Sequence, residues 1–536
     1  MCTGAFKSRT AAVLFLAAAL LCGGVCSYGC GGGHVAQADM TDDNYRVFYE
    51  IFVGSFADSD GDGTGDLQGI ISRLDYLNDG DMLSEKSLGI QGIWLSPVFS
   101  SPSYHKYDAA DYYSIDETYG TEEDLKELIA LCHNRNVKVI LDLAINHTSS
   151  DNVWFMKFVN AHKAGDSTDA YYDFYSWAKL SERTGGVTYA EIPGCKDEYY
   201  ECNFSPDMPE LNFDNEAVRG EVLKIAKHYL DLGVDGFRFD AVKYIYYSDT
   251  ASCVDFWKWY MSELKAYRED IYCVGECWAN DTETLEYFEA LNCFNFQMAQ
   301  SEGYIANAAK GTNIKTFTNY VVNYRNKIMQ ADSDAMMIPF ISNHDMDRSA
   351  GYLTLATGRM NMAANLYILC SGSPFIYYGE EIGMKGTRGA ANTDANRRLA
   401  MLWGDGGTAK DPVGTTYSAG KQTNGTVAEQ SENAGSLYRY YCRLITIRNK
   451  YPEIARGGYK ALEYENSRFG GFLITYSEDT TVLLHNTADV EITIDLSECS
   501  DFPDTISEVM DYIGQGKASL KGTVLTLGAQ TSVILK

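Results

Sequence analysis

Positive charge is scarce in this chain of 536 residues. Its 44 lysines and arginines stand against 73 aspartates and glutamates, and the formal net charge is −29 at pH 7. Nucleic acids and anionic membranes are polyanions that such a surface would repel, so we expect no nucleic-acid partner and favour a neutral substrate. Proline is also rare, at 10 residues against 39 tyrosines, and tyrosine rings suit stacking on the apolar faces of sugars.

The N-terminus carries the run "TAAVLFLAAALLCGGVC", which is too short, and too rich in small residues at its end, for a membrane span. Lys7 and Arg9 precede it, as in an export signal. We expect residues 1–30 to be a signal peptide, 31–44 a linker, and the mature protein to be an extracellular monomer. "SYGCGGG" looks like the end of a lipoprotein signal, so simple secretion and a lipid anchor on Cys30 both stay open. Membrane contact is expected only through that anchor.

Cysteine pairs with metal-ligand spacing are missing, since the sequence holds no CxxC pair, and this disfavours structural zinc. Ten cysteines follow the signal, and several sit in apolar runs that are typical of buried free thiols. Cys195 and Cys202 lie instead in one polar loop with six residues between them. Export would permit a disulfide there, and both states stay open.

From residue 45 onward, short apolar or aromatic runs alternate with helix-like segments. The stretch 121–136 opens with Thr121 and Asp124 in a capping-box arrangement. The strand candidates are 45–53, 89–99, 137–147, 234–242, 271–278, 293–300, 336–345 and 374–382. Eight such units in series predict an α/β fold, a (β/α)8 TIM barrel whose active site lies on the loops after the strands.

Uneven spacing predicts two attachments to this barrel. The stretch after the third strand is far longer than an ordinary βα loop, so we expect a small inserted domain over 148–213. The barrel then comprises 45–147 and 214–455, with a long active-site loop at 383–432. From 456 to 536 short alternating strands predict a C-terminal antiparallel β-sandwich domain.

The stretch "DSDGDGTGDL", residues 58 to 67, crowds carboxylates into a glycine-rich loop. A solvated acidic turn is one interpretation. The regular spacing favours a hard cation, because like charges this close repel one another unless an ion lies among them. The first positions imitate an EF-hand, but position twelve is a glycine where that motif needs glutamate. We expect a structural calcium ion held by Asp58, Asp60, Asp62, Thr64 and Asp66.

Four predicted strands end in polar segments: "DLAINH" (142–147), "GFRFDAVK" (236–243), "GECW" (275–278) and "ISNHD" (341–345). For any one alone, a structural salt bridge or strand cap would be the better interpretation. Together they place carboxylates and imidazoles on one rim of the barrel, where this architecture does its chemistry. The four segments therefore predict a catalytic site.

In order and spacing, these segments resemble the signature regions of the α-amylase family, glycoside hydrolase family 13. "GIQGIWLSPVF" at the second strand, "MPELN" (208–212) and "GSPFIYYGEE" (372–381) extend the resemblance over residues 45 to 536. The acidic loop resembles the calcium loop of the oligo-1,6-glucosidase and neopullulanase branches. "MPELN" lies between the patterns of those two branches.

The resemblance implies a retaining glycoside hydrolase, which needs two carboxyl groups about 5 to 5.5 Å apart. Asp240 is expected to be the nucleophile, kept ionised by Arg238 two residues earlier on the same strand face. Glu276 is expected to be the general acid/base, with a raised pKa. Asp345 would be the third carboxylate, binding sugar hydroxyls and stabilising the oxocarbenium-like state.

Further residues are expected around the sugar. Tyr107 resembles the tyrosine that stacks on it, Asp142 is expected to orient Arg238, and Asn146 to tie the barrel to the inserted segment. For the histidines a core role is the alternative, and for the basic residues a solvated rim charge. The residues assigned to substrate binding are His105, Tyr107, Asp108, His147, Arg238, Lys243, His344 and Arg398.

The favoured function is an endo-acting α-amylase that cleaves α-1,4 bonds in starch and maltooligosaccharides. An oligo-1,6-glucosidase, a neopullulanase or a 4-α-glucanotransferase on the same scaffold is the enzymatic alternative. A catalytically inactive binding or scaffold protein is the alternative from another class. It is disfavoured because Asp240, Glu276 and Asp345 are all present.

Overall fold

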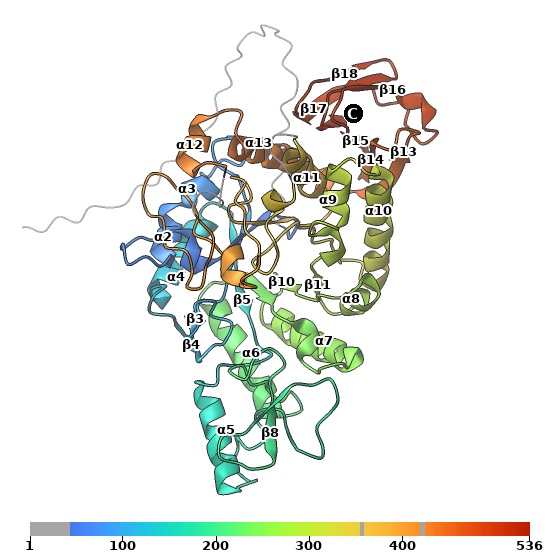
Figure 1. The fold of residues 1–536 in the computed structure, drawn as a ribbon. Helices are drawn as coiled ribbons and strands as arrows, with labels where there is room; N and C mark the ends of the chain where they lie inside the picture. Colours follow the sequence, from blue (N-terminus) through green and yellow to red (C-terminus); the bar gives the residue numbers. More distant parts are fainter. Residues whose placement is uncertain (1–42, 354–357, 419–423) are drawn as a thin grey trace, which may run out of the picture. The chain divides into compact units, whose positions relative to one another are not determined.

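The computed structural model describes residues 43–353, 358–418 and 424–536, all within one compact unit. The predicted signal peptide and Cys30 lie outside the described residues. A parallel sheet in the order β11-β10-β9-β5-β2-β1-β12 forms its centre (Figure 1). Its strands are β1 (Phe48–Ile51), β2 (Gly92–Leu95), β5 (Lys138–Leu143), β9 (Gly236–Phe239), β10 (Tyr272–Gly275), β11 (Asn292–Cys293) and β12 (Phe375–Tyr377).

The seventh predicted strand, at 336–345, is reduced to a single parallel bridge between Ile338 and Phe294. Pro339 follows at once, and because proline carries no N–H it cannot extend a ladder of hydrogen bonds. Backbone bonds on both sides still close the ring: Asn295 N donates to Ile338 O (3.1 Å) and Phe375 N to Pro339 O (3.0 Å). The predicted (β/α)8 barrel is confirmed, with one position held by irregular backbone.

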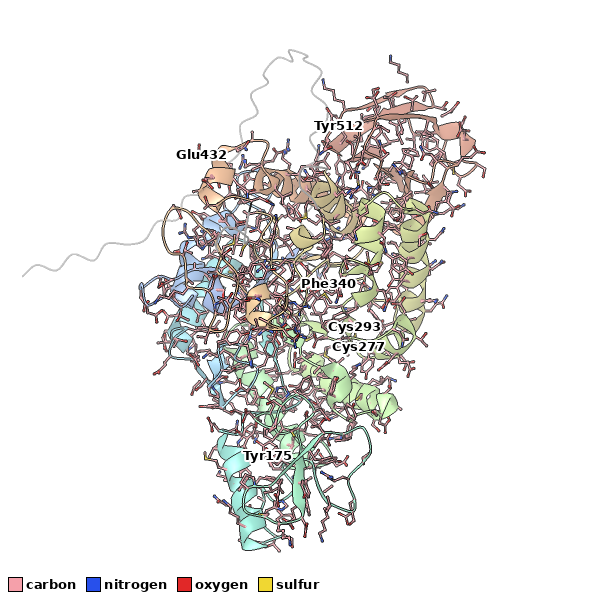
Figure 2. The ribbon with its side chains drawn as sticks, in the orientation of Figure 1. Tyr175, Cys277, Cys293, Phe340, Glu432 and Tyr512 are labelled. Atoms are coloured by element: carbon pink, nitrogen blue, oxygen red, sulfur yellow. The ribbon has the colours of Figure 1, made fainter. Side chains whose placement is uncertain are left out.

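Aromatic and aliphatic side chains fill the barrel interior. Phe48 of β1 stacks on Phe375 of β12 with ring centroids 4.7 Å apart, and Trp94 and Tyr272 from other strands lie within the same core. Phe340, labelled in Figure 2, belongs to this core as well. The strand residues are buried except the half-buried Lys138 and Asn292 at strand starts, which explains why most strands read as continuous apolar runs in the sequence.

Helices lie between successive strands and cover the outside of the sheet (Figure 1). Helix α4 (Glu122–His133) begins at the predicted capping box: Thr121 Oγ1 accepts from Asp124 N (3.2 Å), and Asp124 Oδ2 accepts from Thr121 N (2.8 Å). Within the described residues, the helices are too short or too polar to cross a bilayer. The other helices of eight or more residues in or beside the barrel are α6 (Glu216–Asp231), α7 (Thr250–Tyr267), α10 (Ile314–Ala331), α11 (Arg359–Ile368) and α13 (Leu437–Lys450).

The long segment after β5 carries helix α5 (Val153–Ala164) and a small antiparallel sheet of β6 (Trp177–Lys179), β8 (Glu198–Glu201) and β7 (Tyr189–Glu191). Cys195 and Cys202, whose disulfide state the sequence left open, lie on opposite sides of β8, Cys195 before it and Cys202 after it. The four residues of β8 lie between the two cysteines, and because a strand rises about 3.4 Å per residue, the backbones of Cys195 and Cys202 are held apart. All ten cysteines in the described residues are free thiols.

The C-terminal part is built of antiparallel strands, as predicted. Five form the sheet β13-β14-β15-β20-β17 and three the sheet β16-β19-β18, and apolar side chains from both sheets share one core. The boundaries expected near 148, 214 and 456 stay predictions. The strands are β13 (Gly458–Glu463), β14 (Phe469–Tyr476), β15 (Asp479–Asn486), β16 (Ile492–Asp495), β17 (Val509–Gly514), β18 (Ala518–Lys521), β19 (Val524–Leu527) and β20 (Thr531–Leu535).

Candidate active site

Strand register places the two principal carboxylates side by side. Phe239 of β9 lies opposite Gly275 of β10, and Glu276 N donates to Phe239 O at 2.9 Å. Asp240 and Glu276 therefore follow directly at the carboxyl ends of neighbouring strands, which lie about 4.8 Å apart in a sheet. In the register of the neighbouring pair, Asp142 of β5 lies opposite Arg238 of β9.

Arg238 joins these carboxylates from beneath. Its Nη1 lies 2.7 Å from Asp240 Oδ1 and 2.8 Å from Asp142 Oδ1, and its Nη2 lies 3.0 Å from Glu276 Oε2. The guanidinium is fully buried, so its charge acts through little solvent. It can fix the positions of all three carboxyl groups through these contacts.

Ala241, directly after Asp240, adopts a left-handed backbone with φ 48° and ψ 44°. Residues other than glycine rarely adopt this backbone conformation. At Ala241 it turns the backbone amide toward the next strand. That amide donates to Glu276 Oε2 at 3.1 Å. The chain reversal after β9 thus supplies a hydrogen bond to the neighbouring carboxyl group.

Glu276 is the carboxyl group whose environment most favours a bound proton. Burial raises its pKa to about 8, because the opposing effect of Arg238 is smaller and because Asp240 and Asp345 also raise it. A carboxylic acid with this pKa is protonated at neutral pH. Glu276 is therefore suited to donating a proton to a leaving oxygen.

Asp345 lies among cations. Its Oδ1 is 2.6 Å from Arg398 Nη2, and its Oδ2 is 3.0 Å from His344 Nε2. Burial alone would raise the pKa of Asp345, but His344 and Arg398 outweigh that effect and hold it well below the usual range. Asp345 is thus a permanent carboxylate, in contrast to Glu276.

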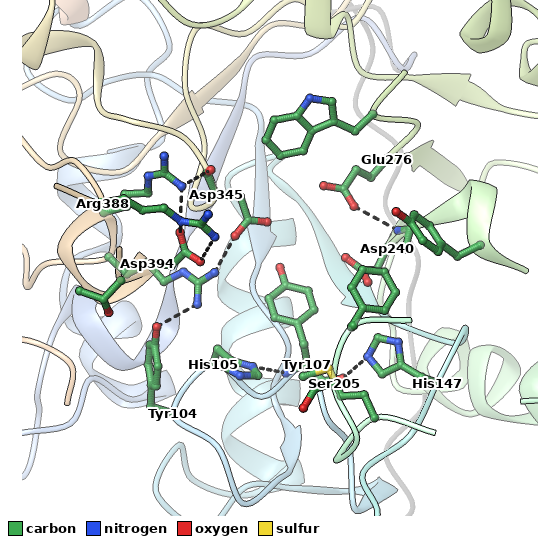
Figure 3. A pocket seen from close by; sticks show the side chains of 18 of the residues that line it. Tyr104, His105, Tyr107, His147, Ser205, Asp240, Glu276, Asp345, Arg388 and Asp394 are labelled. Carbon is green, nitrogen blue, oxygen red and sulfur yellow. Dashed lines mark hydrogen bonds and ion pairs between the residues drawn. The ribbon is translucent and has the colours of Figure 1, made fainter. Parts of the chain in front are cut away.

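A cavity of about 930 Å³ opens above these groups at the carboxyl ends of the strands. Figure 3 shows Asp240 and Glu276 on one side of it and Asp345 facing them. Eight predicted residues line the cavity: Asp240, Glu276, Asp345, His105, Tyr107, His147, Lys243 and Arg398. Residues from distant parts of the sequence therefore meet around one space.

Comparison with known proteins assigns the chain that carries this site to a family. The family described as "Alpha amylase, catalytic domain" matches residues 50–457. The chain belongs to the α-amylase family, glycoside hydrolase family 13. It is thus an enzyme of a family that acts on α-glucans.

Individual relatives of this family-13 enzyme align over most of its length. Alpha-amylase 3 from Dictyoglomus thermophilum is 34% identical over 496 residues, covering 91% of this chain and 93% of that protein. 4-alpha-glucanotransferase from Thermotoga neapolitana is 34% identical over 356 residues, covering 65% and 74%. The solved structure of Eubacterium rectale Amy13B superposes with a TM-score of 0.84 at 37% identity, covering 92% of this chain and 96% of that one.

Three residues assigned to sugar binding in the family-13 enzyme lie behind the cavity wall. Asp108 is buried and accepts from Ser101 Oγ at 2.8 Å, which holds the loop that carries Tyr107. Arg238 and His344 are fully buried and contact the carboxylates that line the cavity. Direct contact of these three residues with sugar stays a prediction.

Two expected supporting contacts of the family-13 site are present. Asp142 Oδ1 binds Arg238 as expected, and its other oxygen accepts from Tyr107 OH at 2.8 Å. Asn146 Nδ2 contacts Glu210 of the "MPELN" segment, and Leu211 N donates to Asn146 O at 3.0 Å. Strand β5 is thereby linked to the end of the long segment that follows it.

Sequence reasoning missed several residues that line the family-13 cavity. Tyr104 and Phe204 lie in loops without a catalytic motif, so no local signal marks them. Tyr244 ends a short 3-10 helix (Val242–Tyr244) directly after the segment 236–243. The loop after β12, predicted as an active-site loop, supplies Arg388 and Arg397. Arg388 binds Asp394 through two contacts of 2.7 Å, and Arg397 Nη1 lies 2.8 Å from Asp394 Oδ1.

In the acidic loop the structure brings together three of the predicted metal ligands. Carboxylate oxygens of Asp58, Asp60 and Asp66 lie within 4.8 Å of one another. Among the described residues Asp62 lies outside this group, and its Oδ1 accepts from Thr64 N at 2.6 Å. Three convergent carboxylates on a turn are the oxygen donors that calcium prefers. A contribution from the carbonyl of Thr64 stays a prediction.

Proposed function

We propose that this enzyme is a retaining, endo-acting α-amylase that cleaves α-1,4 bonds in starch and maltooligosaccharides. The observation that supports it most is the pair Asp240 and Glu276 on neighbouring strand ends at the floor of the cavity. Their common partner Arg238 keeps the two carboxyl groups close, as a retaining mechanism requires. Alpha-amylase 3, which aligns over most of the chain, supports the α-1,4 assignment.

In this proposal Asp240 attacks the anomeric carbon and Glu276 gives its proton to the departing glycosidic oxygen. The bond to the leaving sugar breaks as the bond to Asp240 forms. In the second step Glu276 takes a proton from water, and the water oxygen replaces Asp240 at the same carbon. Asp345 would bind hydroxyl groups of the distorted ring, and Tyr107 would stack on it.

The shape of the site supports cleavage within a chain. Phe204 and Trp278 line the cavity and are 47% and 42% exposed, so aromatic surface continues outward from the catalytic carboxyl groups. Such rings can stack on sugar units beyond the one being cleaved. Lys243 Nζ donates to Trp278 O at 3.0 Å and supports the backbone at this rim.

Product analysis tests the proposed specificity. The purified protein would be incubated with starch, pullulan, isomaltose and sucrose, and the products resolved by size. We expect a broad distribution of maltooligosaccharides from starch early in the reaction, with isomaltose and sucrose left intact. Release of mainly glucose from chain ends would contradict endo-action, and hydrolysis of isomaltose would favour an oligo-1,6-glucosidase.

A 4-α-glucanotransferase is the second candidate, favoured by the relative of that name from Thermotoga neapolitana. It would use the same two carboxyl groups, with a sugar hydroxyl in place of water in the second step. The same assay separates the two activities when maltotetraose is the only substrate. Products longer than the substrate, without a matching rise in reducing ends, would establish transfer as the main activity.

We also propose a structural calcium ion bound by Asp58, Asp60 and Asp66. The three carboxylates and the tight glycine turns between them support it, with Gly61 and Gly63 at φ 86° and 101°. Asp66 in addition accepts from Gly69 N at 2.7 Å and so caps helix α2 (Leu67–Ser72). An ion here would hold the loop against that helix, away from the catalytic carboxylates.

Chelation is expected to lower the melting temperature, because removal of the ion leaves the three carboxylates to repel one another. Differential scanning calorimetry with and without a strong chelator would measure this, and added Ca²⁺ should restore the parent value. Asp58→Asn should make the protein insensitive to the chelator, whereas Asp62→Asn, outside the carboxylate group, should keep the response. Loss of turnover at unchanged stability would contradict a structural role.

Export stays a proposal as well. The N-terminal run and the "SYGCGGG" segment support an extracellular protein that is either secreted or anchored through a lipid on Cys30. Mass spectrometry of the mature N-terminus would distinguish a free cleaved end from a lipid-modified cysteine. An intact N-terminus in the mature protein would contradict both forms of the proposal.

A further inference from the structure

Glu50 is a buried carboxylate in the barrel that no signature segment contains. It lies in β1 two residues after Phe48, so both side chains point into the barrel interior. Register places it between Trp94 of β2 and Tyr377 of β12. With only 2% of its surface exposed, Glu50 needs a partner for its charge.

That partner is His344, the residue before Asp345. Glu50 Oε1 lies 2.6 Å from His344 Nδ1, while on the far side of the ring His344 Nε2 lies 3.0 Å from Asp345 Oδ2 and 2.7 Å from Tyr107 OH. The imidazole is fully buried between two carboxylates. Only a doubly protonated ring can donate to both of them at once.

The hydroxyl of Tyr107 agrees with this assignment. It lies within donating distance of Asp142 Oδ2 at 2.8 Å, and it can then accept from His344 Nε2. The ring of Tyr107 stacks on the imidazole with centroids 5.4 Å apart, and Trp94 meets it edge-on at 5.7 Å. The ring of His344 is therefore held on its faces by aromatic residues and at its nitrogens by acceptors.

We propose that Glu50 is a positioning residue of the active site: by accepting from Nδ1 it fixes the orientation and the second proton of His344, which then donates through Nε2 to Asp345 and Tyr107. Glu50 reaches the cavity only through His344. The proposal rests on the role proposed above for Asp345. It assigns to β1, which carries none of the signature residues, a part in holding the third catalytic carboxylate.

The charges around His344 give the direction of the expected effect. Burial alone would lower the pKa of His344, but Asp345 and Glu50 outweigh it and raise it to about 10. The imidazolium is therefore present across the neutral range and lost only as pH rises through that value. The titratable or charged groups that face His344 or its contacts are Glu50, Asp345, Tyr107, Asp142, Arg238 and Arg398.

Glu50→Gln keeps the size of the side chain and an acceptor oxygen but removes the charge. The pKa of His344 should fall, because one of its two stabilising carboxylates is gone. We expect kcat/KM at pH 7 to fall about tenfold or more. The limb near pH 8 belongs to Glu276, and a second loss of activity above it, which follows deprotonation of His344, should move about one pH unit lower. Glu381→Gln, at a buried carboxylate that binds Tyr49 and Tyr76 instead, should leave both quantities unchanged.

A double-mutant cycle separates this role from general support of the barrel. If Glu50 acts through His344, Glu50→Gln should cost little further activity in a His344→Asn background. Melting temperature and circular dichroism would establish that each variant is folded. A folded Glu50→Gln variant with parent kcat/KM and pH profile would overturn the proposal, as would an equal loss in the His344→Asn background.

The assay would use the α-glucan that the parent enzyme cleaves fastest. Failure of the proposed α-1,4 specificity would appear in the parent enzyme itself, as a different preferred substrate. Failure of the Glu50 proposal would appear only as a parent-like variant on that substrate. The two outcomes are therefore distinguishable.

Discussion

Replacement of Asp240 by asparagine is expected to abolish turnover. The amide is isosteric and can still face Arg238, but it cannot form the covalent bond to the anomeric carbon. Loss of a nucleophile of this kind costs roughly 10⁴-fold or more in kcat. The measurement is release of reducing sugar from soluble starch, followed long enough to detect the residual rate.

Two controls belong with the Asp240 variant. Asp235 is a buried aspartate directly before the first residue of β9, at the end of the strand away from Asp240, and its carboxylate lies 2.8 Å from His133 Nε2. The Asp235→Asn variant should retain activity. Asp240→Ala with azide is expected to form a β-glycosyl azide, because the azide attacks directly from the vacated side of the ring. Asp240→Asn with the parent rate would show that another residue is the nucleophile.

Replacement of Glu276 by glutamine is expected to lower kcat on starch by about 10²- to 10⁴-fold, the usual contribution of a general acid. The pKa of Glu276 is about 8, so the acid form persists through neutral pH. In the parent enzyme the alkaline limb of kcat/KM should follow loss of this proton as pH rises through 8. That limb should disappear from the residual activity of Glu276→Gln.

Leaving-group chemistry provides the control for Glu276. An aryl α-maltooside with a good leaving group needs little protonation, so the variant should lose far less in its first step on that substrate. Azide can then replace water without base assistance, and the product should be the α-glycosyl azide, opposite in configuration to that from Asp240→Ala. Equal losses on starch and on the aryl substrate would contradict the general-acid role.

The same variant should be more stable than the parent in alkali. The folded pKa of Glu276 lies above its ordinary value of 4.5. The folded state therefore holds this proton more tightly than the unfolded chain, and the parent loses stability as pH rises from about 4.5 toward 8. Glutamine does not titrate, so the difference in melting temperature should grow across that interval.

Local sequence patterns predicted most of the catalytic constellation. Asp240 and Glu276 each follow directly after a buried strand, Asp345 follows the irregular buried backbone at the seventh position, and the barrel brings all three to the same rim. This convergence depends only on strand order and on where each strand ends. Both features can be predicted from the apolar runs in the sequence and their spacing.

Other features depended on local backbone conformation that sequence spacing does not give. Asp62 has the same spacing as its neighbours in the acidic loop, yet it lies outside the group formed by Asp58, Asp60 and Asp66 among the described residues. Cys195 and Cys202 are close in sequence but lie at opposite ends of one strand. In both cases sequence spacing gives the distance along the chain, whereas backbone conformation sets the distance in space.

The sequence by itself determined the barrel, the order of its strands and the three carboxylates at its rim, because these follow from periodicities a few residues long. Only the tertiary structure decided that Glu50 of β1 binds His344, and that Asp108, Arg238 and His344 lie behind the cavity wall rather than in it. Burial and partners belong to the assembled fold. A buried charge takes its role from whichever side chain the fold places against it.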